Sequence, residues 1–79
     1  MALDFYAEGE GVAEGLAAEV LVDEAEGLRG LIASGPTATE ILMGMRWHLQ
    51  DIDRANKTAR QGTKRKIREL LIELNKALS

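Results

Sequence analysis

The 79-residue chain contains no cysteine, so disulfides and thiolate metal sites are excluded. It has one histidine, His48, which argues against a histidine-based metal site and against a catalytic histidine. It has no apolar run of 18 residues, so we predict no membrane span. No basic region followed by an apolar stretch opens the chain, so we expect no signal peptide and a cytoplasmic location.

Aromatic residues are also scarce, because Phe5, Tyr6 and Trp47 are the only ones. Apolar residues make up 46% of the chain, but eleven of them are alanines, which add little buried area. A domain of this size buries a modest fraction of its surface. We therefore expect a homo-oligomer, which would bury area that a monomer cannot.

The net charge of −3 averages two halves of opposite sign. Residues 1–40 hold nine acidic residues and one basic residue, whereas residues 41–79 hold nine basic and four acidic residues. Seven of the ten basic residues lie in residues 54–68, which contain no acidic residue. This asymmetry predicts a polyanionic partner for the basic half, or charge pairing between halves or between subunits.

Apolar residues recur with helical spacing in three stretches, so we predict an all-α single domain over residues 1–79. The expected helices span approximately residues 12–33, 38–60 and 64–78. Turns are expected at residues 34–36 and 61–63, and Thr37 to Glu40 fits a capping box. Short connections favour antiparallel neighbours and hence a small bundle of about three helices.

The first forty residues allow other local structures. Residues 1–10 have no clear period, and Leu3, Phe5 and Tyr6 could pack as an arm or a short strand. The glycines at positions 9 and 11 favour a flexible segment rather than a helix. Residues 20–22 could also form a short strand, with a break in the first helix near residues 23–26.

The basic segment is the first candidate site. Its side chains would neutralise phosphates and release counterions, which predicts nucleic-acid binding, with duplex DNA as the expected form. The alternative is a solvated face, or a contact with an acidic protein surface. The predicted nucleic-acid-binding residues are Gln50, Arg54, Lys57, Arg60, Lys64, Arg65, Lys66 and Arg68.

Residues 28–62 resemble the helix-turn-helix core of winged-helix regulators. The residues that carry the resemblance are Leu28, Leu31, Ile32, the segment Gly35 to Ile41, Met45, the segment Ile52 to Ala55, and Gly62. The resemblance implies DNA binding, with Gln50, Arg54 and Lys57 facing bases or phosphates. The alternative is one unbroken helix through residues 45–48, which the spacing of the apolar stripe supports.

Trp47 and Met43 are the second candidate site. On a continuous helix both residues lie nearly opposite the apolar stripe, which predicts a surface for a partner or for self-association. The alternative is that Trp47 covers the core or the N-terminal residues. The second functional hypothesis is therefore a protein-interaction or assembly module, such as an adaptor or an inhibitor of a larger complex.

We predict no enzymatic activity, no catalytic residue, no cofactor and no metal site. The carboxylates of residues 8–26 lack the spacing of a calcium loop and have no nucleophile beside them, so a solvated helix face is expected. The glycines do not follow a predicted strand, so they do not form a phosphate-binding motif.

Overall fold

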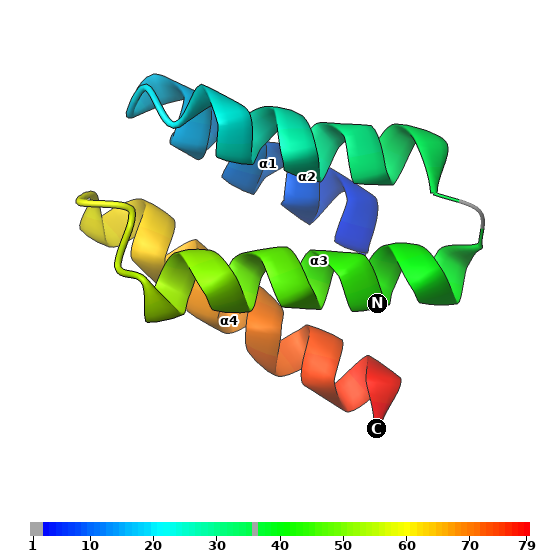
Figure 1. The fold of residues 1–79 in the computed structure, drawn as a ribbon. Coiled ribbons are helices and arrows are strands. Elements are labelled where there is room, and N and C mark those ends of the chain that lie inside the picture. Colours follow the sequence, from blue (N-terminus) through cyan, green and yellow to red (C-terminus); the bar gives the residue numbers. More distant parts are fainter. Residues whose placement is uncertain (1–2, 36) are drawn as a thin grey trace.

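A computed structural model describes residues 3–35 and 37–79, which form four α-helices (Figure 1). They are α1 (Phe5–Ala18), α2 (Val22–Ser34), α3 (Ala38–Arg54) and α4 (Gln61–Leu78). The all-helical prediction is confirmed, with four helices where about three were expected. Within the described residues, no helix has the length and apolar character needed to cross a membrane.

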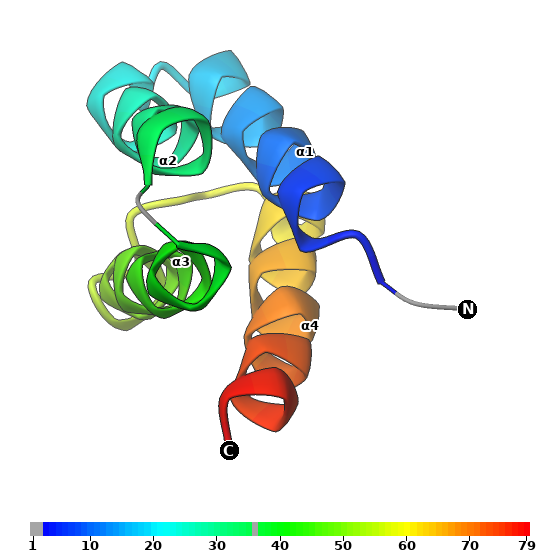
Figure 2. The ribbon, with the colours of Figure 1, turned by 90° about the vertical axis from the view of Figure 1, so that its right-hand side faces the viewer.

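Consecutive helices run in opposite directions and form two hairpins, α1–α2 and α3–α4 (Figure 1). The hairpins pack so that α2 contacts α3 and α1 contacts α4. Figure 2 shows α2 and α3 nearly end-on, whereas α4 runs across the view, so the helices do not form a parallel-sided bundle. The buried core draws on all four helices: Val12, Ala13, Leu16, Ala25, Leu28, Ile41, Met45, Leu49, Ile52, Ile67, Leu70, Leu71 and Leu74.

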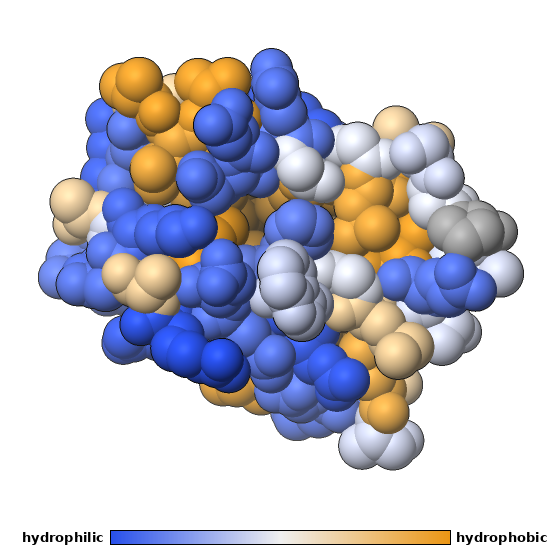
Figure 3. Space-filling view, in the orientation of Figure 1, coloured by the Kyte–Doolittle hydropathy of each residue, from blue (hydrophilic) through white to orange (hydrophobic). Residues whose placement is uncertain are grey.

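Surface hydropathy differs between regions of the face seen in Figure 3. Apolar atoms are visible at the α1–α2 turn and between α2 and α3 near the α2–α3 connection. Hydrophilic side chains cover most of the C-terminal half of α3, whereas apolar atoms are visible again near the C-terminal end of α4.

The single helix predicted over residues 12–33 is wrong, because the chain reverses between α1 and α2. At 100° per residue, a continuous helix would place Ala25 about 180° from Leu16. In the structure both side chains lie in the same core, because the chain reverses at a break between them. The backbone provides it with a Schellman motif, in which Val20 takes a left-handed conformation (φ 66°) and the Leu21 N–H donates to the Leu16 carbonyl at 2.9 Å. The strand considered for residues 20–22 does not form.

The N-terminal segment, expected as a flexible arm or short strand, is helical from Phe5. Asp4 caps α1, because its carboxylate accepts the backbone N–H groups of Tyr6 and Ala7, each at 3.1 Å. Gly9 is a packing residue, since an added Cβ would lie 2.8 Å from Ile32 Cδ1 on α2. Residues 1 and 2 of the expected arm lie outside the described part of the chain.

The predicted start of the α3 helix is correct, and its predicted end is not. Thr37 caps the helix, because its Oγ1 accepts the Glu40 N–H at 3.1 Å, which is one of the two hydrogen bonds of a capping box. The helix ends at Arg54 rather than at residue 60, because Asn56 takes a left-handed conformation (φ 53°). Residues 55–60 therefore form the connection, and the turn expected at residues 61–63 is already part of α4.

We expect Val20→Gly to raise the free energy of unfolding by about 1 kcal/mol. A left-handed conformation costs a residue with a Cβ about 1–2 kcal/mol, part of which is offset by the greater freedom of glycine in the unfolded chain. The Val20 side chain is 83% exposed, so little packing is lost. Urea unfolding followed by circular dichroism measures the change.

The control is Asn56→Gly, which should change stability less because asparagine tolerates the left-handed region. A loss of stability in Val20→Gly would contradict the assignment of strain to this turn.

Candidate functional site

The connection between α3 and α4 is held by a carboxylate from the other hairpin. Glu19, at the C-terminal end of α1, accepts the buried Thr58 hydroxyl and the backbone N–H groups of Ala59 and Arg60, the last two at 2.8 and 3.3 Å. In Figure 1 the α1–α2 turn and the α3–α4 connection lie at the same end of the molecule. This contact fixes the connection that carries the basic segment.

Glu19 also affects the electrostatics of the start of α4. Lys64, Arg65 and Lys66 follow a helix N-terminus, where positive charge opposes the helix dipole. The Thr58 hydroxyl lowers the pKa of Glu19 below 4.5, desolvation works against this, and the backbone N–H groups of Ala59 and Arg60 also lower it. A charged carboxylate is thereby kept beside the N-terminus of α4, where negative charge is favourable.

Two of the predicted nucleic-acid-binding residues form ion pairs within the chain. Lys57 Nζ lies 3.3 Å from Asp51 Oδ2, and Arg68 Nε lies 3.2 Å from Asp53 Oδ1. All four of these side chains are substantially solvent-accessible, and exposed ion pairs contribute about 0–1 kcal/mol each. Both basic residues can therefore leave their carboxylate partner for another anion at a small cost in free energy.

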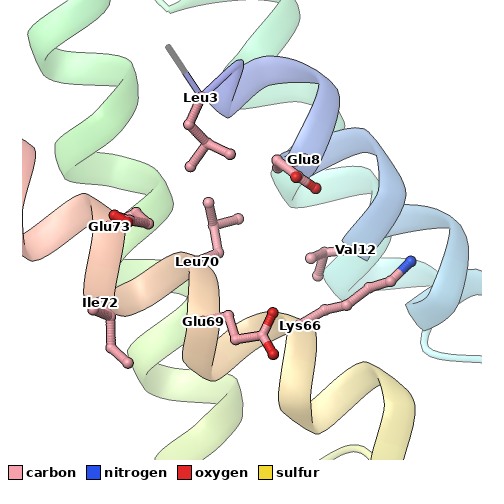
Figure 4. Close-up of a pocket in the computed structure, with 8 residues that line it drawn as sticks. All are labelled: Leu3, Glu8, Val12, Lys66, Glu69, Leu70, Ile72 and Glu73. Carbon is pink, nitrogen blue, oxygen red and sulfur yellow. The ribbon is translucent and has the colours of Figure 1, made fainter. Parts of the chain in front are cut away.

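The basic side chains of α4 divide between two sides of the helix. Lys64, Arg65 and Arg68 line a shallow hollow of about 220 Å³ on the outer side of α4. We call this hollow, with its three basic residues, the basic hollow. Lys66 instead extends toward α1 (Figure 4), and with Arg60 it lines a second depression between α1 and the start of α4. The basic run in the sequence is therefore not one surface in the fold.

The opposite charges of the two halves are not neutralised by ion pairs inside the chain. Among the described residues, the pair between Arg29 and Glu10 lies within the α1–α2 hairpin, at 3.2 Å. The other ion pairs lie within residues 37–79. Pairing between the halves, which the charge asymmetry allowed, does not occur within the described part of one chain. Glu19, which does bridge the hairpins, accepts hydrogen bonds from a hydroxyl and backbone N–H groups.

The α3 helix is continuous through residues 45–48, where the helix-turn-helix resemblance would place its turn. Met43, Trp47, Gln50 and Arg54 follow at spacings of four, three and four residues, which puts them in one row along the side of α3 opposite its buried residues. We call this row the outer face of α3. Trp47 is 65% exposed and Met43 is 49% exposed, so both lie at the surface, as the sequence indicated.

Glu19 and Thr58 were not identified from the sequence. They are 39 positions apart, and neither belongs to a motif. The sequence contained no signal for this contact, because Glu19 lies inside the single helix predicted over residues 12–33 and becomes a helix end only in the structure.

Comparison of the chain with protein-family models, with curated proteins and with solved structures finds no match. Among the described residues, no group of three or more histidine, cysteine, aspartate or glutamate side chains could hold a metal ion.

Thr58→Val should lower the free energy of unfolding by about 1.5 kcal/mol. The substitution keeps the shape of this buried side chain and removes the hydroxyl that donates to a charged acceptor. Thermal or urea unfolding at neutral pH measures the loss. Unchanged stability would mean that the hydrogen bond from the Thr58 hydroxyl to Glu19 does not stabilise the fold.

The stability of the protein should fall in acid partly through Glu19. Because its pKa is lower in the folded state, its stabilising contribution is present above the unfolded pKa near 4.5 and is lost as the pH falls through the folded pKa. Glu19→Gln should therefore weaken the pH dependence of stability below 4.5. The matched control is Glu14→Gln on the exposed side of α1. An identical pH dependence of stability in both variants would contradict a stabilising role for the Glu19 hydrogen bonds.

Proposed function

We propose that the chain is a non-enzymatic protein that binds nucleic acid, with duplex DNA as the expected form. The observation that carries this proposal is the basic hollow on α4, where Lys64, Arg65 and Arg68 line one exposed concave surface. Glu69 is the acidic residue of the same hollow. Cations that share one exposed surface can neutralise phosphates of the same backbone and release their counterions.

Further basic residues lie at the ends of the neighbouring elements. Arg54 is exposed at the end of α3, and the start of α4 near Arg60 is fixed by the Glu19 contact. Lys57 and Arg68 can exchange their exposed carboxylate partners for phosphates. Contacts of this kind set affinity and salt dependence, whereas sequence specificity needs contacts to base edges. We therefore expect binding with weak sequence preference.

The overall charge of −3 opposes this interaction at long range. The acidic residues belong mainly to the α1–α2 hairpin, so a duplex must approach the α4 side. A homo-oligomer that presents several basic hollows to one duplex would raise the apparent affinity without new contacts.

Binding to a labelled 20-base-pair duplex should weaken about 100-fold between 50 and 200 mM salt, as expected for about four phosphate contacts. Fluorescence anisotropy across a salt series measures the slope. Lys64→Ala and Arg65→Ala should each reduce that slope by about one, because each removes a phosphate contact.

Lys66→Ala is the matched control, since it removes the same charge from the side of α4 that faces α1. We expect it to change the slope less than Lys64→Ala does. Equal effects of Lys64 and Lys66 would show that net charge, rather than the basic hollow, determines binding. No detectable binding at 50 mM salt would overturn the proposed function.

A further inference from the structure

A groove of about 350 Å³ lies between α1 and α4 (Figure 4), and it shares Glu69 and Ile72 with the basic hollow. Its apolar lining comes from Leu3, Val12, Leu70 and Ile72. Leu3 and Ile72 are 40% and 56% exposed, so apolar surface remains open to solvent here. The volume is sufficient for one large side chain with part of a neighbour.

The polar residues of the groove are predominantly acidic. Glu8, Glu69 and Glu73 line it together with one cation, Lys66. Glu73 has a long ion pair with Lys76, at 3.8 Å. Neither Glu8 nor Glu69 belongs to an ion pair between described residues. The groove therefore suits an apolar group with a positive charge beside it.

The outer face of α3 has this composition. Trp47 and Met43 supply exposed apolar surface, and the Trp47 ring meets His48 edge-on with ring centroids 5.2 Å apart. Arg54 lies on the same row two turns after Trp47, is exposed, and has no ion pair among the described residues. Tryptophan and arginine are the residues most often found as energetic anchors of protein interfaces.

Acidic residues near this face do not cancel its charge. Asp51 lies at its edge and is already paired with Lys57, at 3.3 Å. Glu40 lies at the N-terminal end of α3, distant in sequence from Arg54. The end of α3 that would meet the acidic groove is thus positive.

We propose that the outer face of α3 of one chain docks into the α1–α4 groove of a second copy. Trp47 fills the apolar floor, and Arg54 lies against Glu8 and Glu69 of the acidic rim. In Figure 2, α3 lies on one side of the molecule and α1 with α4 on the other, so one chain can use both surfaces at once. Such a heterologous contact closes into a ring or continues as a filament.

The charges favour a second copy as the occupant. Each chain carries both the cationic apolar face and its acidic apolar complement. The two halves also remain opposite in charge without ion pairs between them in the described part of the chain. Docking through Arg54 would neutralise Glu69, which lines both the groove and the basic hollow. Self-association would thus occupy Arg54 and leave Lys64, Arg65 and Arg68 of the basic hollow for a polyanion.

Light scattering coupled to size-exclusion chromatography tests the proposal over a concentration series. The wild-type mass should exceed the 8.6 kDa of one chain, increase with concentration and fall with added salt. Trp47→Ala and Glu69→Lys should each weaken association about tenfold or more. Both sites are exposed, and circular dichroism confirms that each variant folds. The double variant Arg54→Glu with Glu69→Lys should regain association relative to Glu69→Lys alone.

Mixing the two weakened variants distinguishes this contact from a symmetric one. Trp47→Ala keeps an intact groove, and Glu69→Lys keeps an intact Trp47, so the mixture should form a one-to-one dimer. A mixture that stays monomeric, while both single variants associate poorly, would indicate a symmetric interface and overturn the proposal. A wild-type chain that stays monomeric at about 1 mM, a concentration at which even weak association with a Kd near 1 mM is measurable, would also overturn it.

Discussion

The hydrogen bonds of Glu19 are the constraint on which the arrangement of the two hairpins depends. This carboxylate lies where α1 ends and satisfies donors at the connection that leads into α4. It couples the α1–α2 turn to the α3–α4 connection at one end of the molecule through hydrogen bonds rather than apolar contacts. It also supplies negative charge at a helix start that is crowded with lysine and arginine.

Charge in this molecule is separated between the hairpins rather than neutralised. Among the described residues, ion pairs form within each hairpin and not between them. The exposed pairs contribute little stability, so the basic residues stay available for other anions. An acidic apolar groove and a cationic apolar helix face lie on different sides of the same chain. These features connect the fold to the proposals of polyanion binding and self-association.

The strongest sequence predictions concern α3 and α4, where periodicity is clear. The apolar stripe of α3 is buried, and it consists of Ile41, Met45, Leu49 and Ile52. The same helical spacing places Trp47 on the opposite, exposed side. The helix break at Val20 was not predicted, because a valine rarely takes the left-handed conformation, and a break was considered only near residues 23–26. The spacing of Leu16 and Ala25 did indicate a break, since their side chains would lie on opposite faces of one straight helix. The left-handed Asn56 lies two residues beyond Arg54, the last residue of α3, and it prevents the helix from continuing to the predicted end at residue 60.

By itself, the sequence determined an all-helical chain, the Thr37 cap, the core faces of α3 and α4, and the separation of acidic from basic residues. These features depend on local spacing and on side-chain type, which act over a few residues. Only the tertiary structure decided which basic residues share a surface. Lys64 and Lys66 are two positions apart, yet they lie on different sides of α4 because the helix turns by about 200° between them. The tertiary structure also decided that Glu19 meets Thr58, a contact between residues 39 positions apart that depends on how the hairpins pack.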